Sequence, residues 1–433
     1  MLTIRDGLFG VTRVPAWLFP VLSAPETQRL RDIRLINTSS PTLPALSDAH
    51  RYTHTVGVLG LMLASERRLR HELGEGAVKE LLVAAVLHDV GSPPFGHLWE
   101  YLLKAETGWT HEGMLKEIIA GTYRPDGKYH QVYYGRGLSL ERVLEGCGVD
   151  PGRVASIVEG TGHLGPLLAG SVDYDNIDNV YRMASLLGLN PNVADAHSLA
   201  GRLAIRGDAL ALTGDALPDL VRWRELRRQC YQILAFDEST LQTQAMLTDA
   251  LSAAMQAGML GAEHWFFTDD AILVRLAETR LTTSAARNIK IAAQRFKTGD
   301  LYSTVSLGWY DIAKAPADDL RHPRRREELR QRLEERLHIP CTPYVFYDSG
   351  TFSKRIDVDV LSGDGSTSAL SVGETSHSTI IGVFTSRHMR PTRARRELVV
   401  EVLEEYGFPS ASLRPLPRRI EGDEFAGQAE LPL

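Results

Sequence analysis

Apolar residues recur every three or four positions over most of this chain, from Glu26 to about Asp311. That spacing places them on one face of an α-helix, and short stretches containing Gly, Pro or Asp separate the segments. The pattern therefore predicts one large, mainly α-helical unit. Its clearest helices are expected at residues 28–36, 50–70, 77–88, 140–147, 154–159, 176–187, 217–234 and 244–259.

The pattern changes toward the C-terminus, where strands are expected beside two helices. The strands are predicted at residues 344–346, 356–361 and 379–384, and the helices at 323–337 and 392–406. The predicted fold class is therefore mainly α with a smaller C-terminal α+β region. The expected parts are a core with a helical extension at 1–320, the α+β region at 321–414 and a loosely ordered tail at 415–433.

Composition and charge limit the classes of partner. The net charge of -6 argues against a surface that binds nucleic acid as a whole. No stretch approaches the roughly 20 apolar residues that cross a bilayer, and charges and prolines interrupt the apolar start, so we expect no signal peptide. Three widely separated cysteines fit a reducing compartment. We therefore expect a cytoplasmic protein without a membrane or nucleic-acid partner.

Histidines and aspartates gather at the predicted helix ends. His54 lies in one expected helix, and His88 and Asp89 directly follow the apolar run LLVAAVL. Two adjacent buried polar groups without partners cost several kcal/mol, and a carboxylate is unfavourable at the negative end of a helix dipole. A hydrogen-bonded core residue explains a single His, but a cation explains the pair better. Together with aspartates in SVDYDNIDNVYRMA, these donors predict a divalent metal site.

The order His, His-Asp and distant Asp resembles the signature of the HD-domain metal-dependent phosphohydrolases. QRLRDIRLIN, RYTHTVGV, HDVGSPPFGH and WTHEG further resemble the deoxynucleoside triphosphate triphosphohydrolase branch, which includes the sterile-alpha-motif and HD-domain enzymes. The resemblance covers roughly Asp6 to Gln232 and implies an HD-domain helical fold, with this core and its helical extension expected at 1–320. It also implies a divalent ion, with Mn or Fe favoured over Mg, Co, Ni or Zn. The metal ligands that it implies are His54, His88, Asp89 and Asp175.

The resemblance implies catalytic roles for three residues after the His-Asp pair, namely His97, His111 and Glu100. A histidine near the scissile P–O bond can donate a proton or hold the attacking water, and a carboxylate can orient it. Their structural alternatives are a helix cap or a surface residue. The substrate-binding residues implied by the resemblance are Arg51, Tyr231 and Gln232, which could instead form a salt bridge or pack within a helix.

This chain also departs from the triphosphohydrolase pattern near the expected sugar and phosphates. The branch has an additional active-site His, a sugar-contacting Gln, and a Lys and Tyr where this chain has other residues. The replacements here are Ser92, Leu35, Asn176 and Asn179, respectively. They leave the metal ligands intact and weaken the implied recognition of a deoxyribose triphosphate.

The resemblance therefore implies an enzyme, expected to be a homo-oligomer, that hydrolyses deoxynucleoside triphosphates to deoxynucleoside and triphosphate. One alternative keeps the chemistry but acts on nucleoside monophosphates or modified nucleotides in a biosynthetic pathway. Two others are an HD-type oxygenase with two metal ions and a nucleotide sensor without turnover. Retention of all four implied ligands and both catalytic histidines favours a hydrolase.

Overall fold

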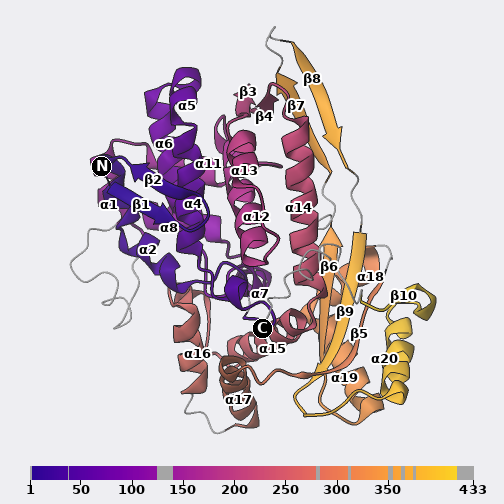
Figure 1. The fold of residues 1–433 in the computed structure, drawn as a ribbon. Coiled ribbons are helices and arrows are strands. Elements are labelled where there is room, and N and C mark those ends of the chain that lie inside the picture. The colour runs from indigo at the N-terminus through magenta and orange to yellow at the C-terminus, as the bar shows by residue number, and fades with distance from the viewer. Residues whose placement is uncertain are drawn as a thin grey trace, which may run out of the picture.

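The protein is described here by a computed structural model that covers residues 2–37, 39–123, 140–278, 283–310, 314–349, 355–361, 366–373 and 377–416. It is mainly α-helical with small sheets, as the sequence predicted (Figure 1). Of the predicted loose tail at 415–433, residues 417–433 lie outside the described residues. No helix in the described ranges has the length and apolar character needed to cross a membrane.

The helical part is built around α4, α6 and α12, whose apolar faces share one core with neighbouring helices. Its helices are α1 (Phe19–Leu22), α2 (Pro25–Arg29), α3 (Pro44–Ser47), α4 (Arg51–Ala64), α5 (Glu66–Leu73), α6 (Glu75–Leu87), α7 (His97–Thr107), α8 (His111–Ile119), α10 (Leu140–Cys147), α11 (Pro151–Val158), α12 (Tyr174–Leu186), α13 (Val193–Ala200), α14 (Leu217–Phe236), α15 (Glu238–Gln256), α16 (Asp269–Ala277) and α17 (Ser284–Thr298).

The predicted helix at 28–36 is wrong beyond its first residues. Helix α2 ends at Arg29, one short 3₁₀ turn follows, and Ile33 is extended. The backbone then pairs with the segment before α4, because Leu35 N–H donates to Ala49 O and Arg51 N–H donates to Ile33 O. This pairing holds the start of α4 in place, which a helix at residues 33–36 could not do.

Strands also occur where none was predicted, two of them before Glu26 and three within the region that was expected to be mainly helical. They are β1 (Leu2–Asp6), β2 (Gly10–Val14), β3 (Leu203–Arg206), β4 (Ala209–Thr213) and β5 (Ser303–Tyr310). The first four form two antiparallel hairpins. Gly207 turns the second hairpin with a φ of +61°, a conformation that glycine adopts readily. Strands of four or five residues are too short to show a clear alternation of apolar and polar residues. The turns between them were therefore the signal that sequence analysis missed.

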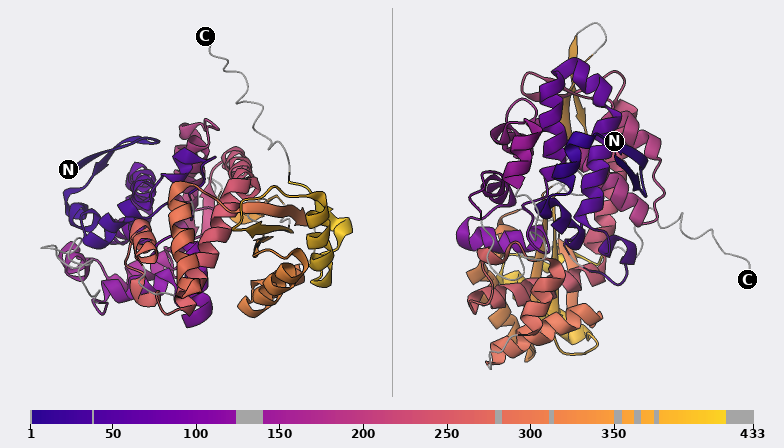
Figure 2. Two further views of the ribbon diagram at one scale, coloured as in Figure 1. Left: turned by 90° about the horizontal axis from the view of Figure 1, so that it is seen from below. Right: turned by 90° about the vertical axis from the view of Figure 1, so that its left-hand side faces the viewer.

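The C-terminal elements form two sheets (Figure 2), and the predicted elements at 323–337, 356–361 and 379–384 are confirmed. One sheet has the order β10-β5-β9-β6, and the other has β3-β4-β7-β8 with β4 and β7 parallel. The remaining bounds are β6 (Thr342–Ser349), β7 (Ile356–Leu361), β8 (Thr367–Val372), β9 (His377–Thr385), β10 (Leu413–Arg414), α18 (Lys314–Arg321), α19 (Pro323–Leu337) and α20 (Arg393–Glu405).

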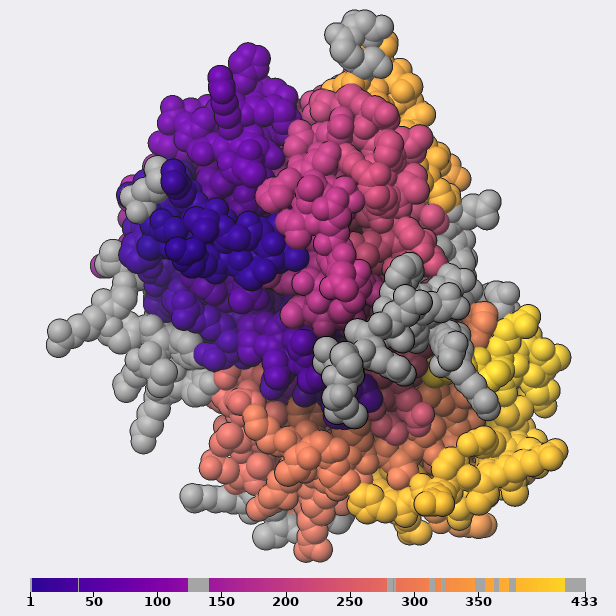
Figure 3. Space-filling view, viewed as in Figure 1, coloured from indigo at the N-terminus to yellow at the C-terminus, as the bar shows by residue number. Residues whose placement is uncertain are grey.

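Both sheets combine strands from the two sides of the expected boundary at residue 320. Ile380 and Phe384 of β9 also share a core with α15, so the C-terminal sheet packs directly on the helical part. In the space-filling view the C-terminal helix α20 lies at the lower right of the same continuous body (Figure 3). The division into domains at residue 320 stays a prediction.

Helices α4 and α12 approach closely at Gly57, one turn after His54. A Cβ atom added to Gly57 would lie 1.8 Å from Asp178 Oδ1 and 2.2 Å from Arg182 Nη2. Both partners are buried and held by an ion pair between them. The glycine is therefore required by packing, because a methyl group would have to push α12 away from α4.

We predict that Gly57→Ala lowers the free energy of unfolding by about 2 kcal/mol, the usual cost of overpacking a filled core. The matched control is Gly76→Ala in α6, where nothing lies within 4 Å of the added Cβ. The control should be neutral or stabilised by about 0.5–1 kcal/mol. Urea denaturation of both variants is the measurement, and equal stabilities would contradict the close approach.

Candidate active site

His54 is the centre of a buried hydrogen-bonded cluster between α4 and α12. Its Nδ1 lies 2.5 Å from Asp178 Oδ2, and its Nε2 lies 2.8 Å from Asp175 Oδ1. Arg182 donates to both oxygens of Asp178 at 2.8 and 3.0 Å, so this carboxylate keeps its charge although it is buried. Burial lowers the pKa of His54, but Asp178 and Asp175 outweigh burial and raise the pKa to about 10.

His88 and Asp89 bring two further donors to the same point from the end of α6. His88 Nδ1 donates to Ala85 O at 2.8 Å, which turns its Nε2 toward His54 Nε2 at 3.2 Å. His88 Nε2 also lies 3.5 Å from Asp89 Oδ2 and 3.9 Å from Asp175 Oδ1. The structure thus brings the four predicted ligands together.

These donors fit a divalent metal ion. Two ligands about 2.1 Å from one ion and at right angles to each other are separated by about 3.0 Å, close to the spacing of the two Nε2 atoms. Asp89 Oδ2 is buried and has no hydrogen-bond partner in the described part of the chain. A cation would satisfy that oxygen and would displace the proton that otherwise sits between the histidines and Asp175. His54, His88 and Asp89 are close enough to hold one ion.

His97, Glu100 and His111 form a second cluster at the start of α7 and α8. Glu100 accepts from His97 Nδ1 at 2.9 Å through Oε2, and from His111 Nδ1 at 2.7 Å through Oε1. The carboxylate therefore points both rings so that their Nε2 atoms are available for proton transfer. The side chain of His97 is 63% exposed and that of His111 only 18%, so His97 meets solvent and His111 faces inward.

The hydrogen bonds of this cluster stabilise the charged forms of Glu100 and His111. Burial raises the pKa of Glu100, but its hydrogen bonds from His111 and His97 reverse that effect and lower it. Burial likewise lowers the pKa of His111, yet the hydrogen bond to Glu100 raises it above the ordinary value. His111 therefore carries its proton at neutral pH more readily than a free histidine does.

Both clusters line one cavity of about 480 Å³, which is large enough for a small organic ligand. Arg51, Tyr231 and Glu112 also line it, and Glu112 was not predicted from the sequence. The other lining residues come from the segment before α4, from α11, α12, α14, α15 and β6, and from the connection between α11 and α12. They include Leu35, Ile36, Asn37, Val158, Leu168, Ala169, Asn179, Met183, Leu234, Ala235, Thr240, Leu241, Gln244 and Phe346.

Two of the three predicted substrate-binding residues line the cavity. Arg51 lines the cavity but also forms a buried ion pair with Asp89 Oδ1 at 2.5 Å. Tyr231 lines the cavity with Arg227 stacked 4.5 Å from its ring centre. Gln232 does not line it; its Oε1 accepts from Arg228 at 2.9 Å. Of the three, only Gln232 does not line the cavity, and its side chain is bound by a neighbour on its own helix.

The residues that depart from the triphosphohydrolase pattern also have definite positions. Ser92 donates to Asp89 Oδ1 at 3.2 Å, so it supports a proposed ligand. Asn176 donates to Asp173 at the start of α12, whereas Leu35 and Asn179 line the cavity. The two departures that line the cavity are therefore one apolar residue and one amide.

Arg29 holds the loop after the His-Asp pair, a role that sequence analysis missed. Its buried guanidinium donates to Val90 O and Ser92 O on one side, and to Trp265 O and Phe267 O on the other. Asp269 adds a second tie by accepting from Phe95 N–H at 2.8 Å. In the sequence, Arg29 is one charged residue in a short segment, and nothing there indicates these contacts.

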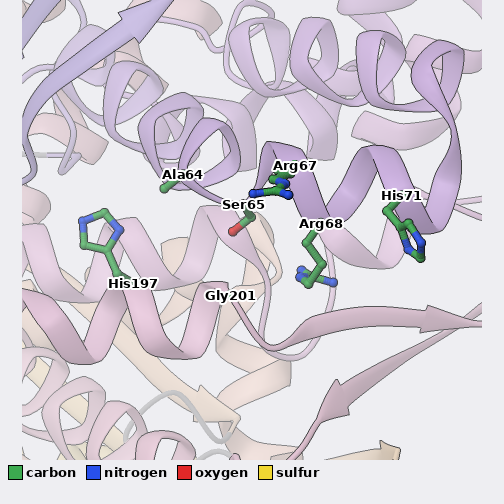
Figure 4. Close-up of a pocket in the computed structure, with 7 residues that line it drawn as sticks. All are labelled: Ala64, Ser65, Arg67, Arg68, His71, His197 and Gly201. Atoms are coloured by element: carbon green, nitrogen blue, oxygen red, sulfur yellow. The ribbon is translucent and has the colours of Figure 1, made fainter.

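A separate cavity of about 580 Å³ lies between α5 and α13 and contains none of the predicted site residues (Figure 4). Its charged wall residues are Arg67 and Arg68, and Arg68 is already bound to Glu72 and to Leu203 O. No carboxylate lines this cavity, so it offers no metal-binding oxygen from a side chain. The predicted site residues that line a cavity all line the one that holds the two histidine clusters.

Part of the chain is similar to a known family and to several known proteins. Residues 51–134 match the HD domain family. Over 254 residues the chain is 25% identical to the uncharacterized protein YwfO of Bacillus subtilis, covering 58% of this chain and 54% of that protein. Over 121 residues it is 28% identical to the human deoxynucleoside triphosphate triphosphohydrolase SAMHD1, covering 26% of this chain and 19% of that protein.

A third relative is the deoxynucleoside triphosphate triphosphohydrolase SAMHD1 homolog of Dictyostelium discoideum, 30% identical over 22% of this chain and 20% of that protein. The chain thus spans about half of YwfO and about a fifth of each triphosphohydrolase. A phosphohydrolase from Bacteroides thetaiotaomicron VPI-5482 superposes with a TM-score of 0.65 at 16% identity, over 90% of this chain and 100% of that one. This likeness shows a shared fold.

We predict that His88→Ala and Asp89→Ala each reduce bound metal to less than about one-tenth of the wild-type stoichiometry, because two of four donors are adjacent and buried. His71→Ala, which changes an exposed histidine of the other cavity, is the control and should keep full metal content. Elemental analysis of purified protein gives the readout. Full metal occupancy in the His88→Ala/Asp89→Ala double variant would contradict the site.

Proposed function

Because this chain belongs to the HD-domain phosphohydrolase superfamily, we propose that it is a metal-dependent nucleotide phosphohydrolase. Its proposed reaction converts a deoxynucleoside triphosphate to deoxynucleoside and triphosphate. The observation that carries the proposal is that a metal-binding cluster and a His-Glu-His cluster line one cavity. The first suits charge neutralisation at a phosphoryl group and the second suits proton transfer.

The proposed metal ligands are His54, His88, Asp89 and Asp175. A divalent ion bound there supplies positive charge at a phosphoryl oxygen and lowers the barrier to attack by water. Asp178 holds the ring of His54 and Arg51 holds the carboxylate of Asp89, at 2.5 Å in each case. The same arginine lines the cavity and is proposed to neutralise charge on the substrate phosphates.

Proton transfer is assigned to His111, His97 and Glu100. Hydrolysis breaks the bond between the α-phosphorus and O5′, so the departing O5′ needs a proton. His111 is inward-facing and holds its proton through Glu100, which suits it to donate from Nε2. His97 shares the same carboxylate at the exposed side and is placed to exchange protons with water.

The decisive experiment incubates purified protein and Mn²⁺, Fe²⁺ or Mg²⁺ with a panel of nucleotides and identifies the products by chromatography. The proposal expects inorganic triphosphate and a deoxynucleoside in equal amounts. Release of orthophosphate from monophosphates would favour the alternative substrate class. Leu35 and Asn179, which replace residues of the triphosphohydrolase pattern, line the cavity and are the reason to keep this alternative. Consumption of dioxygen would favour the oxygenase. A homo-oligomeric assembly stays a prediction.

We predict that Glu100→Gln moves the alkaline limb of the kcat–pH profile to lower pH by about one unit. The carboxylate raises the pKa of His111. Its loss lowers that pKa, and the protonated acid is then lost at a lower pH. Glu112→Gln should shift the limb less, because Glu112 acts on His111 more weakly and its oxygen lies 3.4 Å from Nε2. An unchanged alkaline limb in Glu100→Gln would argue against His111 as the acid.

A further inference from the structure

One wall of the active-site cavity is formed by α14, α15 and β6, which is a strand of the C-terminal sheet. Leu234, Ala235, Leu241 and Phe346 make most of this wall apolar. Thr240 also lines it, but its hydroxyl donates to Asp237 Oδ2 at 2.7 Å. Such a wall suits a flat, largely apolar ring rather than a charged phosphate.

Gln244 of α15 places an amide in this wall, and Tyr344 of β6 sets the orientation of that amide. The Tyr344 hydroxyl donates to Gln244 Oε1 at 2.7 Å. Burial raises the pKa of Tyr344, so the phenol remains a neutral donor. With Oε1 engaged, the NH₂ group is what Gln244 can offer to a ligand. This group has no hydrogen-bond partner among the described residues and is not fully buried.

Phe346 lies two residues after Tyr344 on the same strand. Residues at this spacing point to the same face of a sheet, and both contact the cavity side, Tyr344 through Gln244 and Phe346 directly. The wall therefore combines an aromatic surface with a fixed pair of N–H donors. Aromatic side chains stack with the faces of nucleobases, and an amide N–H discriminates between the groups on a base edge.

We propose that Gln244, oriented by Tyr344, selects nucleotides by donating its amide NH₂ to a keto oxygen of the base, while the base packs against Phe346. The preferred bases are thymine, uracil and guanine. Cytosine and adenine present an exocyclic amine at the equivalent edge, which would meet the NH₂ donor to donor. This inference rests on the proposed function, because it assumes that the ligand of the cavity is a nucleotide.

The test compares two size-matched pairs of substrates, dTTP with dCTP and dGTP with dATP. We expect kcat/KM for the keto member to exceed that for the amino member by roughly tenfold, the usual size of one hydrogen-bond difference. Gln244→Glu replaces the NH₂ by an acceptor oxygen, so it should reverse the preference in both pairs. Any general repulsion of phosphate by the new charge cancels in the ratio.

Tyr344 is a positioning residue, and its variant has a different expected signature. Tyr344→Phe frees the amide to present either group, so both ratios should fall toward one while kcat with a saturating substrate changes little. Tyr310→Phe is the control, because Tyr310 is buried in the same sheet and its hydroxyl has no hydrogen-bond partner in the described structure. Gln242→Glu controls for charge, since Gln242 lies on the same helix as Gln244 but donates its amide to Thr304 of β5. Both controls should keep the wild-type ratios.

Dissociation constants for the four nucleotides, measured by calorimetry in a His111→Ala background, separate this inference from the proposed function. If the keto preference and its reversal appear in binding without any turnover by the wild type, the function is wrong and the inference stands. If the wild type turns nucleotides over with ratios near one, or Gln244→Glu leaves the ratios unchanged, the inference is wrong and the function stands. A wild type that binds none of the four overturns the inference.

Discussion

The hydrogen bond between Asp178 and His54 is the constraint on which the rest of the site depends. It requires α4 and α12 to approach so closely that Gly57 has no room for a side chain. It also fixes the His54 ring, because Nδ1 is bound to Asp178 and only Nε2 remains for a metal. Helix packing and the direction of a metal-binding nitrogen are thus set by the same contact.

Buried charges can be tolerated here because charged groups of opposite sign lie beside them. Arg182 binds Asp178 and also Asp6 at the end of β1, and Arg51 binds Asp89 across α4 and the turn after α6. Removing one partner would leave an uncompensated charge, which costs more than the pair itself contributes. The site is therefore a network that assembles as a whole. Asp89 Oδ2 has no hydrogen-bond partner among the described residues, and it is the oxygen that a bound cation would satisfy.

Sequence patterns predicted the parts of this structure that depend on local periodicity. The long helices and the mixed helices and strands of the C-terminal region follow from the spacing of apolar residues. The resemblance named four proposed ligands, and the structure places them close together. Contacts between distant segments had no such signal. Arg29 binding four carbonyls and Gln244 held by Tyr344 both join residues far apart in the sequence. The short hairpins are local, but sequence analysis missed them because their strands are too short to show an alternation of apolar and polar residues.

The sheet that contains β6 is held against α15 by contacts from three of its strands. Ile380 and Phe384 of β9 pack with α15 in one core. Tyr344 of β6 donates to Gln244, and Gln242 donates to Thr304 of β5. Beside these contacts, β6 supplies Phe346 to the cavity wall. This sheet cannot slide relative to α15 without breaking these hydrogen bonds or exposing core residues. The distance between the proposed metal ligands and this wall is therefore defined by the fold, and the proposed function requires such a distance if a nucleotide is to be held at both ends.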